Sequence, residues 1–341
     1  MSRAAVLALF FAASFAVPSA TPQSQAPSFT TANRTVAVYA TVTNSRGRLV
    51  PDLPRDAFSV DDNGKRQTLT LFSNDIQPIT VVMLLDRSGS MKPNLDLEER
   101  AAETFVREMG SDDKARIGSF ATSIQIDPED FTSDRETLTK ILRNDLQKEG
   151  PTPLWNAVDR AIDKLLLEKG RRVVLVFTDG VDMPMNFSNH NKSLKDVMKR
   201  AEEEDVMVYA IGLAGENGMP TSGGDRNGRG AFGPPGGFGG LGGRGMGGGY
   251  GNGRPALEKP DEGLPKIAGA TGGGYFELTS PTELALTFAH VADELHHQYA
   301  LGFAPEKLDG KMHDLTVRLS QPDLVARARK RYLASKVLGA P

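Results

Sequence analysis

The 341-residue sequence has no cysteine, and its acidic and basic residues are nearly equal in number. Without thiols the protein has no disulfide bonds, no thiolate zinc site and no cysteine nucleophile. The formal net charge of −3 gives no electrostatic reason to expect a polyanionic partner, so we expect no binding to nucleic acid. Glycine, by contrast, is abundant, with 36 residues in the chain, many of which lie in one region. Because the net charge indicates no class of partner, partners must be inferred from a specific site.

Long apolar runs are also scarce, and the most apolar one lies at the N-terminus. Arg3 precedes an apolar stretch over 4–17, which ends in the small residues Pro18-Ser19-Ala20, as in an export signal. The stretch is shorter than the roughly 20 residues that a bilayer crossing needs. We therefore expect residues 1–26 to be a signal peptide, with a retained anchor as the alternative. After cleavage we expect no stable membrane insertion, and a protein exported to the periplasm or the extracellular space of a bacterium.

Both ends of the remaining chain show the period-2 alternation of half-buried strands. In segment 29–78, Asn63-Gly64 suits a tight hairpin turn, and 67–72 is expected to continue as one strand. Segment 298–336 ends in a strand pattern over 324–332, whose alternating arginines we interpret as a solvated strand face. Either end alone has too few strands to be stable. The two ends are therefore predicted to form one small β-sandwich.

The middle of the chain, 79–297, alternates strand and helix patterns. Two runs are apolar, 79–85 with Thr80 as its single polar residue and 173–177 throughout, as in parallel strands that are covered on both faces. This alternation predicts a doubly wound, mostly parallel α/β sheet inserted in the β-sandwich. Within it, more than half of 223–253 is glycine, so 216–255 is predicted to be a disordered loop.

Oxygen-bearing side chains follow both apolar runs. Asp86, Ser88 and Ser90 come after the first run at alternating positions, which present side chains to one side of an extended turn. Asp179 follows the second run, and Thr152 lies in the loop before the helix between the two. Ligands of open α/β sheets bind at the carboxyl ends of the strands. Two carboxylates and three hydroxyls there predict a site for a hard cation such as Mg²⁺, Mn²⁺ or Ca²⁺.

With DRSGS at 86–90, Thr152 and Asp179, the middle of the chain resembles a von Willebrand factor type A (VWA) domain. The flanking sequences DLPRDAFSVDDNGK and YALGFAP resemble the VWA-related proteins of acidobacteria; Pro153 departs from the pattern, because alanine is commoner there. The resemblance identifies the five oxygen donors as a metal-ion-dependent adhesion site. It also implies a Rossmann-like sheet of order 3-2-1-4-5-6 with one antiparallel edge strand, in which strands one and four carry the two acids.

The resemblance further implies a secreted protein-binding or cell-adhesion module rather than an enzyme. Ser88, Ser90 and Thr152 would contact the cation directly, and the acids directly or through water. The remaining coordination position would accept an acidic side chain of a partner protein. Two neighbouring residues each have two possible roles. Asp182 either orients a ligand or a water molecule near the metal, or only starts the next turn. Trp155 either packs its helix against the core or contacts the rim of the site.

Two other functions compete with adhesion. A metal-dependent hydrolase would use the cation to activate water, but His190, the nearest histidine after Asp179, lies in a polar segment. His290, His296 and His297 near the last predicted helix are expected to be satisfied or solvated rather than zinc ligands. The third reading is a structural VWA module that binds no ligand.

Overall fold

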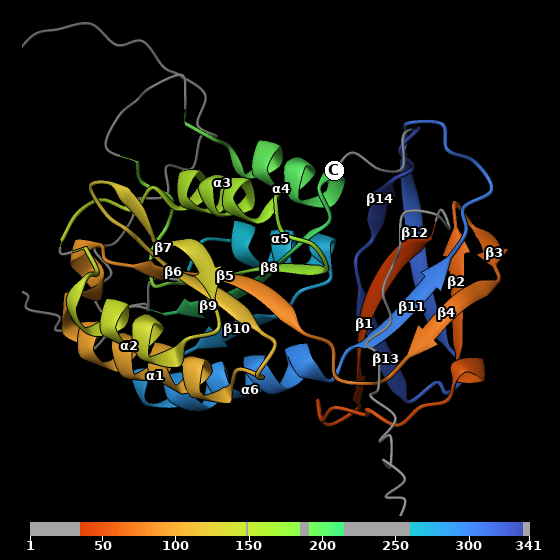
Figure 1. Cartoon of the computed structure of the whole chain (residues 1–341), viewed down its shortest axis with the longest axis horizontal. Helices are drawn as coiled ribbons and strands as arrows, with labels where there is room; N and C mark the ends of the chain where they lie inside the picture. Colours follow the sequence, from red (N-terminus) through yellow and green to blue (C-terminus); the bar gives the residue numbers. More distant parts are fainter. Residues whose placement is uncertain (1–34, 148, 185–190, 215–259, 337–341) are drawn as a thin grey trace, which may run out of the picture.

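The computed structural model describes residues 35–147, 149–184, 191–214 and 260–336. The predicted signal peptide and the predicted glycine-rich loop lie outside the described residues. Figure 1 shows an α/β unit beside an all-β unit. Among the described residues, none of the helices combines the length and the apolar character that a bilayer crossing requires.

A six-stranded sheet forms the centre of the α/β unit (Figure 1). Its strand order is β10-β9-β8-β5-β6-β7, and every neighbouring pair is parallel except β6 with β7. When the six strands are numbered in chain order and the sheet is followed from β7 to β10, the order is 3-2-1-4-5-6. The predicted sheet order and its antiparallel edge strand are therefore confirmed. The strands are β5 (Ile79–Asp86), β6 (Lys114–Phe120), β7 (Ile124–Thr132), β8 (Arg171–Thr178), β9 (Val206–Leu213) and β10 (Tyr275–Leu278).

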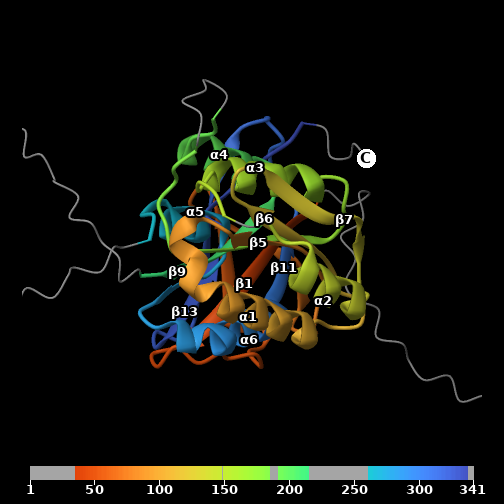
Figure 2. The same cartoon turned by 90° about the vertical axis from the view of Figure 1, so that its left-hand side faces the viewer.

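Helices cover both faces of this sheet, as Figure 2 shows. One face packs against α1 (Leu95–Glu108), α2 (Arg135–Asn144) and α6 (Leu284–His296). The other packs against α3 (Leu154–Leu165), α4 (Leu194–Glu203) and α5 (Gly263–Thr271). Because both faces are covered, every residue of β5 is buried.

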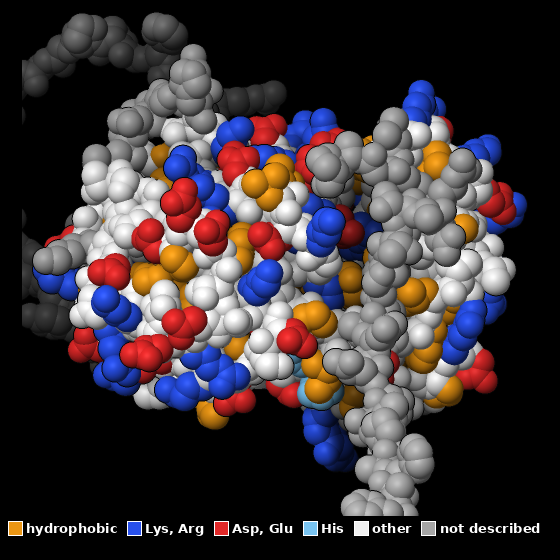
Figure 3. All heavy atoms as spheres, in the orientation of Figure 1, with side chains coloured by type: hydrophobic (Ala, Val, Ile, Leu, Met, Phe, Trp, Pro, Cys, Tyr) orange, Lys and Arg blue, Asp and Glu red, His pale blue; other side chains and the backbone are white. Residues whose placement is uncertain are grey.

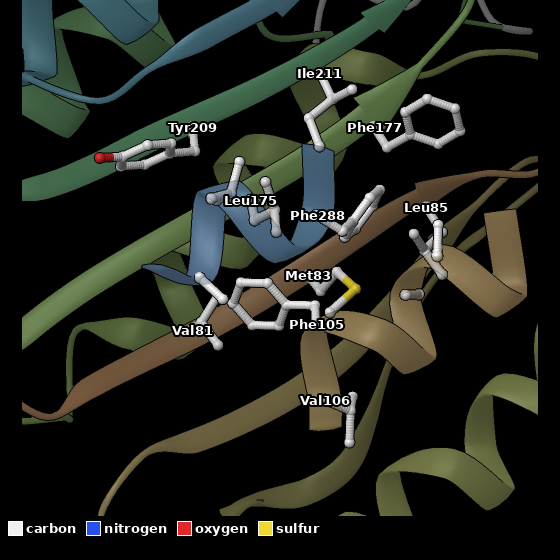
Figure 4. Packing of buried hydrophobic residues seen from close by; sticks show 14 of the residues in the cluster. Val81, Met83, Leu85, Phe105, Val106, Leu175, Phe177, Tyr209, Ile211 and Phe288 are labelled. Carbon is white, nitrogen blue, oxygen red and sulfur yellow. The ribbon is translucent and has the colours of Figure 1, made fainter. Parts of the chain in front are cut away.

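Alternate residues of β5 enter the two cores. Val81, Met83 and Leu85 face the first core, where Figure 4 shows them with Phe105 of α1 and Phe288 of α6. Val82 and Leu84 belong to the second core. This is the period-2 geometry of a strand, with apolar residues at odd and even positions. The β5 backbone is thereby fixed on both sides up to its last residue.

Two four-stranded antiparallel sheets from both chain ends form the β-sandwich. They share one core, in which the ring centroids of Phe58 and Tyr299 lie 4.6 Å apart. The first sheet has the order β13-β1-β11-β4 and the second β14-β12-β2-β3. The strands are β1 (Val36–Asn44), β2 (Phe58–Asp62), β3 (Lys65–Gln67), β4 (Leu69–Ser73), β11 (Tyr299–Phe303), β12 (Met312–Leu319), β13 (Leu324–Ala328) and β14 (Arg331–Leu333).

The structure confirms the hairpin at Asn63-Gly64, where both residues have positive φ between β2 and β3. It corrects two strand predictions. Segment 67–72 is not one strand, because the chain leaves β3 in one sheet and enters β4 in the other. Segment 324–332 likewise divides between β13 and β14, which belong to different sheets.

Of the three alternating arginines of this last segment, only Arg331 of β14, whose side chain is 45% exposed, lies on a solvated face. Arg327 pairs with the buried Glu294 of α6, and Arg329 pairs with Asp205 before β9 at 2.7 Å. Arg327 and Arg329 therefore face the α/β unit, and for these two the prediction was wrong because it considered strand periodicity without the neighbouring unit. On the face shown in Figure 3, acidic and basic side chains are interspersed.

Candidate metal centre

The site begins where two adjacent parallel strands end. β5 pairs in parallel with β8, with Leu85 opposite Phe177. Asp86 is the last residue of β5 and has no exposed surface, and Asp179 directly follows β8 with 7% of its surface exposed. Parallel strands end at the same edge of a sheet, so both carboxylates lie there.

Hydroxyl groups connect the two carboxylates. The Thr178 hydroxyl donates to Asp86 Oδ2, and the Ser90 hydroxyl donates to Asp179 Oδ1 at 2.8 Å. Ser88 Oγ and Ser90 Oγ lie 3.0 Å apart, and the Ser88 N–H donates to Asp86 Oδ1 at 2.8 Å. The turn after β5 becomes the 3-10 helix η3 (Gly89–Asn94), which brings Ser88 and Ser90 to the same side. Four of the five predicted residues thus form one hydrogen-bonded group.

Thr152 reaches this group on a loop that is tied to both neighbours. The Gly89 N–H donates to the Gly150 carbonyl at 3.2 Å, and Thr152 exchanges two backbone hydrogen bonds with Met183 at 3.3 and 2.8 Å. A Cβ atom on Gly180 would lie 3.6 Å from Thr152 Oγ1 and 3.9 Å from Asp86 Oδ2. Both oxygens therefore border the space beside Gly180.

Gly150 fixes the position of this loop. A Cβ atom there would lie 2.4 Å from the Thr122 nitrogen and 2.8 Å from the Ala121 carbonyl carbon, both of them backbone atoms. Such contacts are sterically forbidden, so only glycine allows the loop to approach the segment after β6 this closely. The position of Thr152 depends on that approach.

The electrostatics of the site favour a bound cation. Burial raises the pKa of Asp86 to about 6; hydrogen bonds from Thr178 and Ser88 oppose this rise and the nearby charge of Asp179 adds to it. Arg87 is adjacent in sequence, but its guanidinium pairs with Glu98 and Glu99 at 3.3 and 3.0 Å. Within the described part of the chain, no Lys, Arg or His forms an ion pair with Asp86. A buried carboxylate in this position lacks the positive charge that would stabilise it.

The donor set fits a hard divalent cation. Carboxylate and hydroxyl oxygens are the ligands that Mg²⁺ and Ca²⁺ prefer, and two carboxylates balance two positive charges. The residues that could hold the cation are Asp86, Ser88, Ser90, Thr152 and Asp179. The described residues contain no cluster of three or more His, Cys, Asp or Glu side chains suited to a metal.

Asp182 and Trp155 meet at the start of α3. Asp182 Oδ1 accepts a hydrogen bond from the Trp155 N–H at 3.2 Å, and the Asp182 N–H donates to Asp261 at 3.2 Å. Burial raises the pKa of Asp182, and the charge of Asp261 adds to the rise. The Trp155 side chain lies in the second core with 4% exposure, so the structure corrects its interpretation as a rim contact. The indole has no exposed face to offer because α3 buries it against the sheet.

Thr178, Gly150 and Gly180 also belong to the site but were not among the predicted site residues. Thr178 was visible as a polar residue at the end of an otherwise apolar strand, where it donates to Asp86. The two glycines gave no signal in a chain with 36 of them, because their role depends on contacts between separate loops.

The described histidines of the last helix lie away from this site. His296 Nε2 contacts Asp113 Oδ2 at 2.6 Å, His297 Nδ1 contacts Asp293 at 3.0 Å, and the His290 ring packs edge-on against Phe276. They are satisfied by local partners, as the sequence analysis expected. His190 lies outside the described residues.

Residues 80–225 match the family model of the von Willebrand factor type A domain. The chain contains a VWA domain. Similar solved structures include a von Willebrand factor type A protein from Catenulispora acidiphila, at 10% identity and a TM-score of 0.45, covering 89% of this chain and 77% of that one. The hypothetical protein BatB from Bacteroides thetaiotaomicron is 19% identical over 64% of this chain and 98% of its own, with a TM-score of 0.42.

A third structure with a VWA fold is proximal thread matrix protein 1 of the mussel byssus, in a form described as having a zinc-occupied MIDAS motif. It is 14% identical to this VWA-containing chain, covers 67% of it and 48% of its own length, and has a TM-score of 0.44. Comparison with curated proteins gives no match to this chain.

Proposed function

We propose that the VWA domain is a metal-dependent protein-binding module. Asp86, Ser88, Ser90, Thr152 and Asp179 hold one divalent cation, Mg²⁺ or alternatively Mn²⁺ or Ca²⁺, and the cation captures an acidic side chain of a partner protein. The observation that carries this proposal is the buried carboxylate of Asp86, which is linked through hydroxyl groups to a second carboxylate and has no ion-pair partner among the described residues.

Binding a partner carboxylate here differs from forming an ordinary surface ion pair. Two unit charges 4 Å apart attract by about 1 kcal/mol in water and by about 4 kcal/mol at an effective dielectric constant near 20. When bound, the cation supplies the positive charge that attracts the partner. The protein residues fix its position and reduce its contact with water, because Asp86, Ser88 and Asp179 are all buried.

VWA domains are generally interaction modules rather than enzymes. A hydrolytic role would require a general base beside the metal ligands, and the described histidines of the last helix contact other groups. We therefore propose adhesion or protein capture outside the cytoplasm. The apolar N-terminal sequence and the absence of cysteine support export to the periplasm or cell surface.

Thermal unfolding with and without cations tests the site. We expect Mg²⁺ or Mn²⁺ at tenfold excess over its dissociation constant to stabilise the native protein by about 1.4 kcal/mol, a rise in Tm of about 3 °C. Asp86→Asn should lose this rise without loss of stability in the metal-free form, because it removes a buried charge. Asp323→Asn, at an exposed position in the turn before β13, is the matched control and should keep it.

Capture of partners from an envelope extract then tests the function. Wild-type protein should retain a partner in Mg²⁺ and release it in chelator, and Asp86→Asn should retain none. Hydrolysis of a phosphoester that depends on Asp179 would instead support the hydrolase, and a cation-insensitive protein would support the structural role.

A further inference from the structure

Two exposed apolar side chains follow Asp179 in the candidate metal centre. Val181 is 43% exposed and Met183 is 69% exposed, and both lie in the segment between β8 and α4. Asp182 between them turns inward, where its carboxylate accepts a hydrogen bond from the Trp155 N–H. Large apolar side chains that are exposed singly need no explanation, but two of them beside a candidate binding site indicate an interaction surface.

The backbone places Met183 next to the residues that could hold the cation. Thr152 and Met183 form an isolated antiparallel bridge, in which each N–H donates to the carbonyl of the other, at 3.3 and 2.8 Å. Residues paired directly in this way present their side chains to the same face, with Cβ atoms about 5 Å apart. The Thr152 hydroxyl and Asp86 Oδ2 both border the space beside Gly180. Met183 therefore lies beside Thr152 on the face of the metal site.

The other side of the Thr152 loop is charged. Ser88 and Gly150 form a parallel bridge, so the loop lies between the turn after β5 and the segment after β8. On the side of the turn, Lys92 and Glu149 form an ion pair at 3.3 Å, with side chains that are 68% and 56% exposed. The rim of the site is therefore apolar on one side and charged on the other, which distinguishes the two directions in which a partner segment could cross it.

A carboxylate that enters the metal site makes no use of Met183. The side chain stays in water unless the partner also carries an apolar side chain close to its acid. Burial of apolar surface is favourable and does not depend on direction. The unbranched thioether side chain of methionine also adapts to apolar groups of different shapes. A polar neighbour of the acid would gain less from this side of the rim.

We propose that Val181 and Met183 form an apolar contact for the partner protein, whose captured acidic residue lies next to a large apolar residue or one position away from it. This contact selects among acidic segments, because the cation alone would accept any accessible carboxylate. The proposal rests on the metal-dependent capture proposed above and adds the class of segment that is captured.

A displayed library tests the contact with a defined probe. Short loops of random sequence around a fixed aspartate are displayed on phage, selected on the immobilised wild-type protein in Mn²⁺ and eluted with chelator. Eluted clones should carry a large apolar residue next to the aspartate, or one position away, more often than unselected clones. Selection on Met183→Ser should not show this enrichment.

The affinity of the selected loops gives a second measurement. As synthetic peptides they should bind Met183→Ser about tenfold more weakly than the wild-type protein, because one apolar contact is lost. The Mn²⁺ affinity of Met183→Ser, measured by calorimetric titration, should be unchanged. Leu167→Ser is the matched control, because it removes an apolar side chain that is 89% exposed beyond the far end of α3, and it should bind the peptides like the wild type.

The contact and the metal-dependent capture fail in different ways. Chelator-eluted clones without an apolar preference, or with equal affinity for the wild type and Met183→Ser, would overturn the contact and leave the capture intact. A loss of Mn²⁺ affinity in Met183→Ser would also overturn it, because Met183 would then support the metal site itself. No chelator-eluted clones from the wild-type protein would contradict the capture, and the contact with it.

Discussion

Asp86 and Gly150 show how single residues determine this site. Asp86 is a carboxylate at the end of a wholly buried strand, held by Thr178 and by the backbone of Ser88. Such a group is unfavourable unless something compensates its charge. Gly150 contributes no donor, yet it positions the loop that carries Thr152. The site therefore depends on Asp86 for its negative charge and on Gly150 for the close approach of the loop, which a side chain at that position would prevent.

Gly150→Ala tests the second of these roles. The added methyl group meets backbone atoms of Ala121 and Thr122, so the loop must move away and take Thr152 with it. We expect a loss of about 1–3 kcal/mol in stability and at least a tenfold weaker affinity for Mn²⁺, measured by calorimetric titration. Gly269→Ala is the control, because its nearest atom is Lys330 Nζ at 4.0 Å, and alanine suits helix α5. Unchanged Mn²⁺ affinity in Gly150→Ala would show that the loop does not position a ligand.

At the scale of elements, Asp113 connects three parts of the VWA domain. Its carboxylate accepts hydrogen bonds from the N–H of Ile79 at the start of β5 (2.9 Å) and from that of Gly110 (2.7 Å). It also contacts His296 at the end of α6 at 2.6 Å. Burial alone would raise the pKa of Asp113, but the hydrogen bonds from His296, Ile79 and Gly110 outweigh it and lower the pKa.

A lowered pKa makes this contribution to stability dependent on pH. It is fully present above the pKa of an aspartate in the unfolded chain, about 3.9, and is lost as pH falls through the lower pKa of the folded state. We expect Asp113→Asn to cost about 2–4 kcal/mol at pH 7. The difference from wild type, measured by urea unfolding, should shrink as pH falls below about 4. The exposed neighbour variant Asp112→Asn should cost little at any pH, and a cost of Asp113→Asn that increases as pH falls below about 4 would contradict this account.

Most elements of the VWA domain could be predicted because their sequence patterns are local. β5 and β8 contain the apolar runs 81–85 and 173–177, and the carboxylate or hydroxyl groups directly after these runs mark the strand ends. The errors arose where one pattern spans two sheets. Segments 67–72 and 324–332 keep their alternation while the chain passes from one sheet of the sandwich to the other, and no local signal marks that passage.

At the scale of the whole molecule, buried polar residues join the VWA domain to the sandwich. Glu294 of α6 is 2% exposed and accepts hydrogen bonds from Arg327 of β13, Tyr209 of β9 and Thr41 of β1. Gln298 donates to Thr41 and to Tyr209 at 2.9 and 3.1 Å. The two units therefore meet through a connected network rather than through a flexible linker.

A double-mutant cycle tests this network. Arg327→Met leaves the Glu294 carboxylate buried without its cationic partner, and we expect it to cost about 2–4 kcal/mol. Glu294→Gln should also destabilise the protein, because it removes the charge that Arg327 faces. The double variant should be more stable than the sum of the two single costs predicts, by about 1–2 kcal/mol in urea unfolding. Strictly additive costs would mean that the pair makes no specific contribution.

This interface could not be predicted from the sequence. Glu294 lies in a helical pattern, Gln298 directly before a strand, Tyr209 in an apolar strand and Arg327 in an alternating one, and nothing local relates them. The five predicted metal ligands were easier to recognise because each stands next to the end of a strand or the start of a helix. Their partners Thr178, Gly150 and Gly180 were missed because they act through contacts between segments.

The most direct test of the central claim is calorimetric titration of the purified, metal-free protein with Mg²⁺, Mn²⁺ and Ca²⁺. The account predicts saturable heat for one cation per chain, which Asp86→Asn abolishes and Asp323→Asn preserves. No saturable heat with any of the three ions, or an unchanged isotherm in Asp86→Asn, would contradict it.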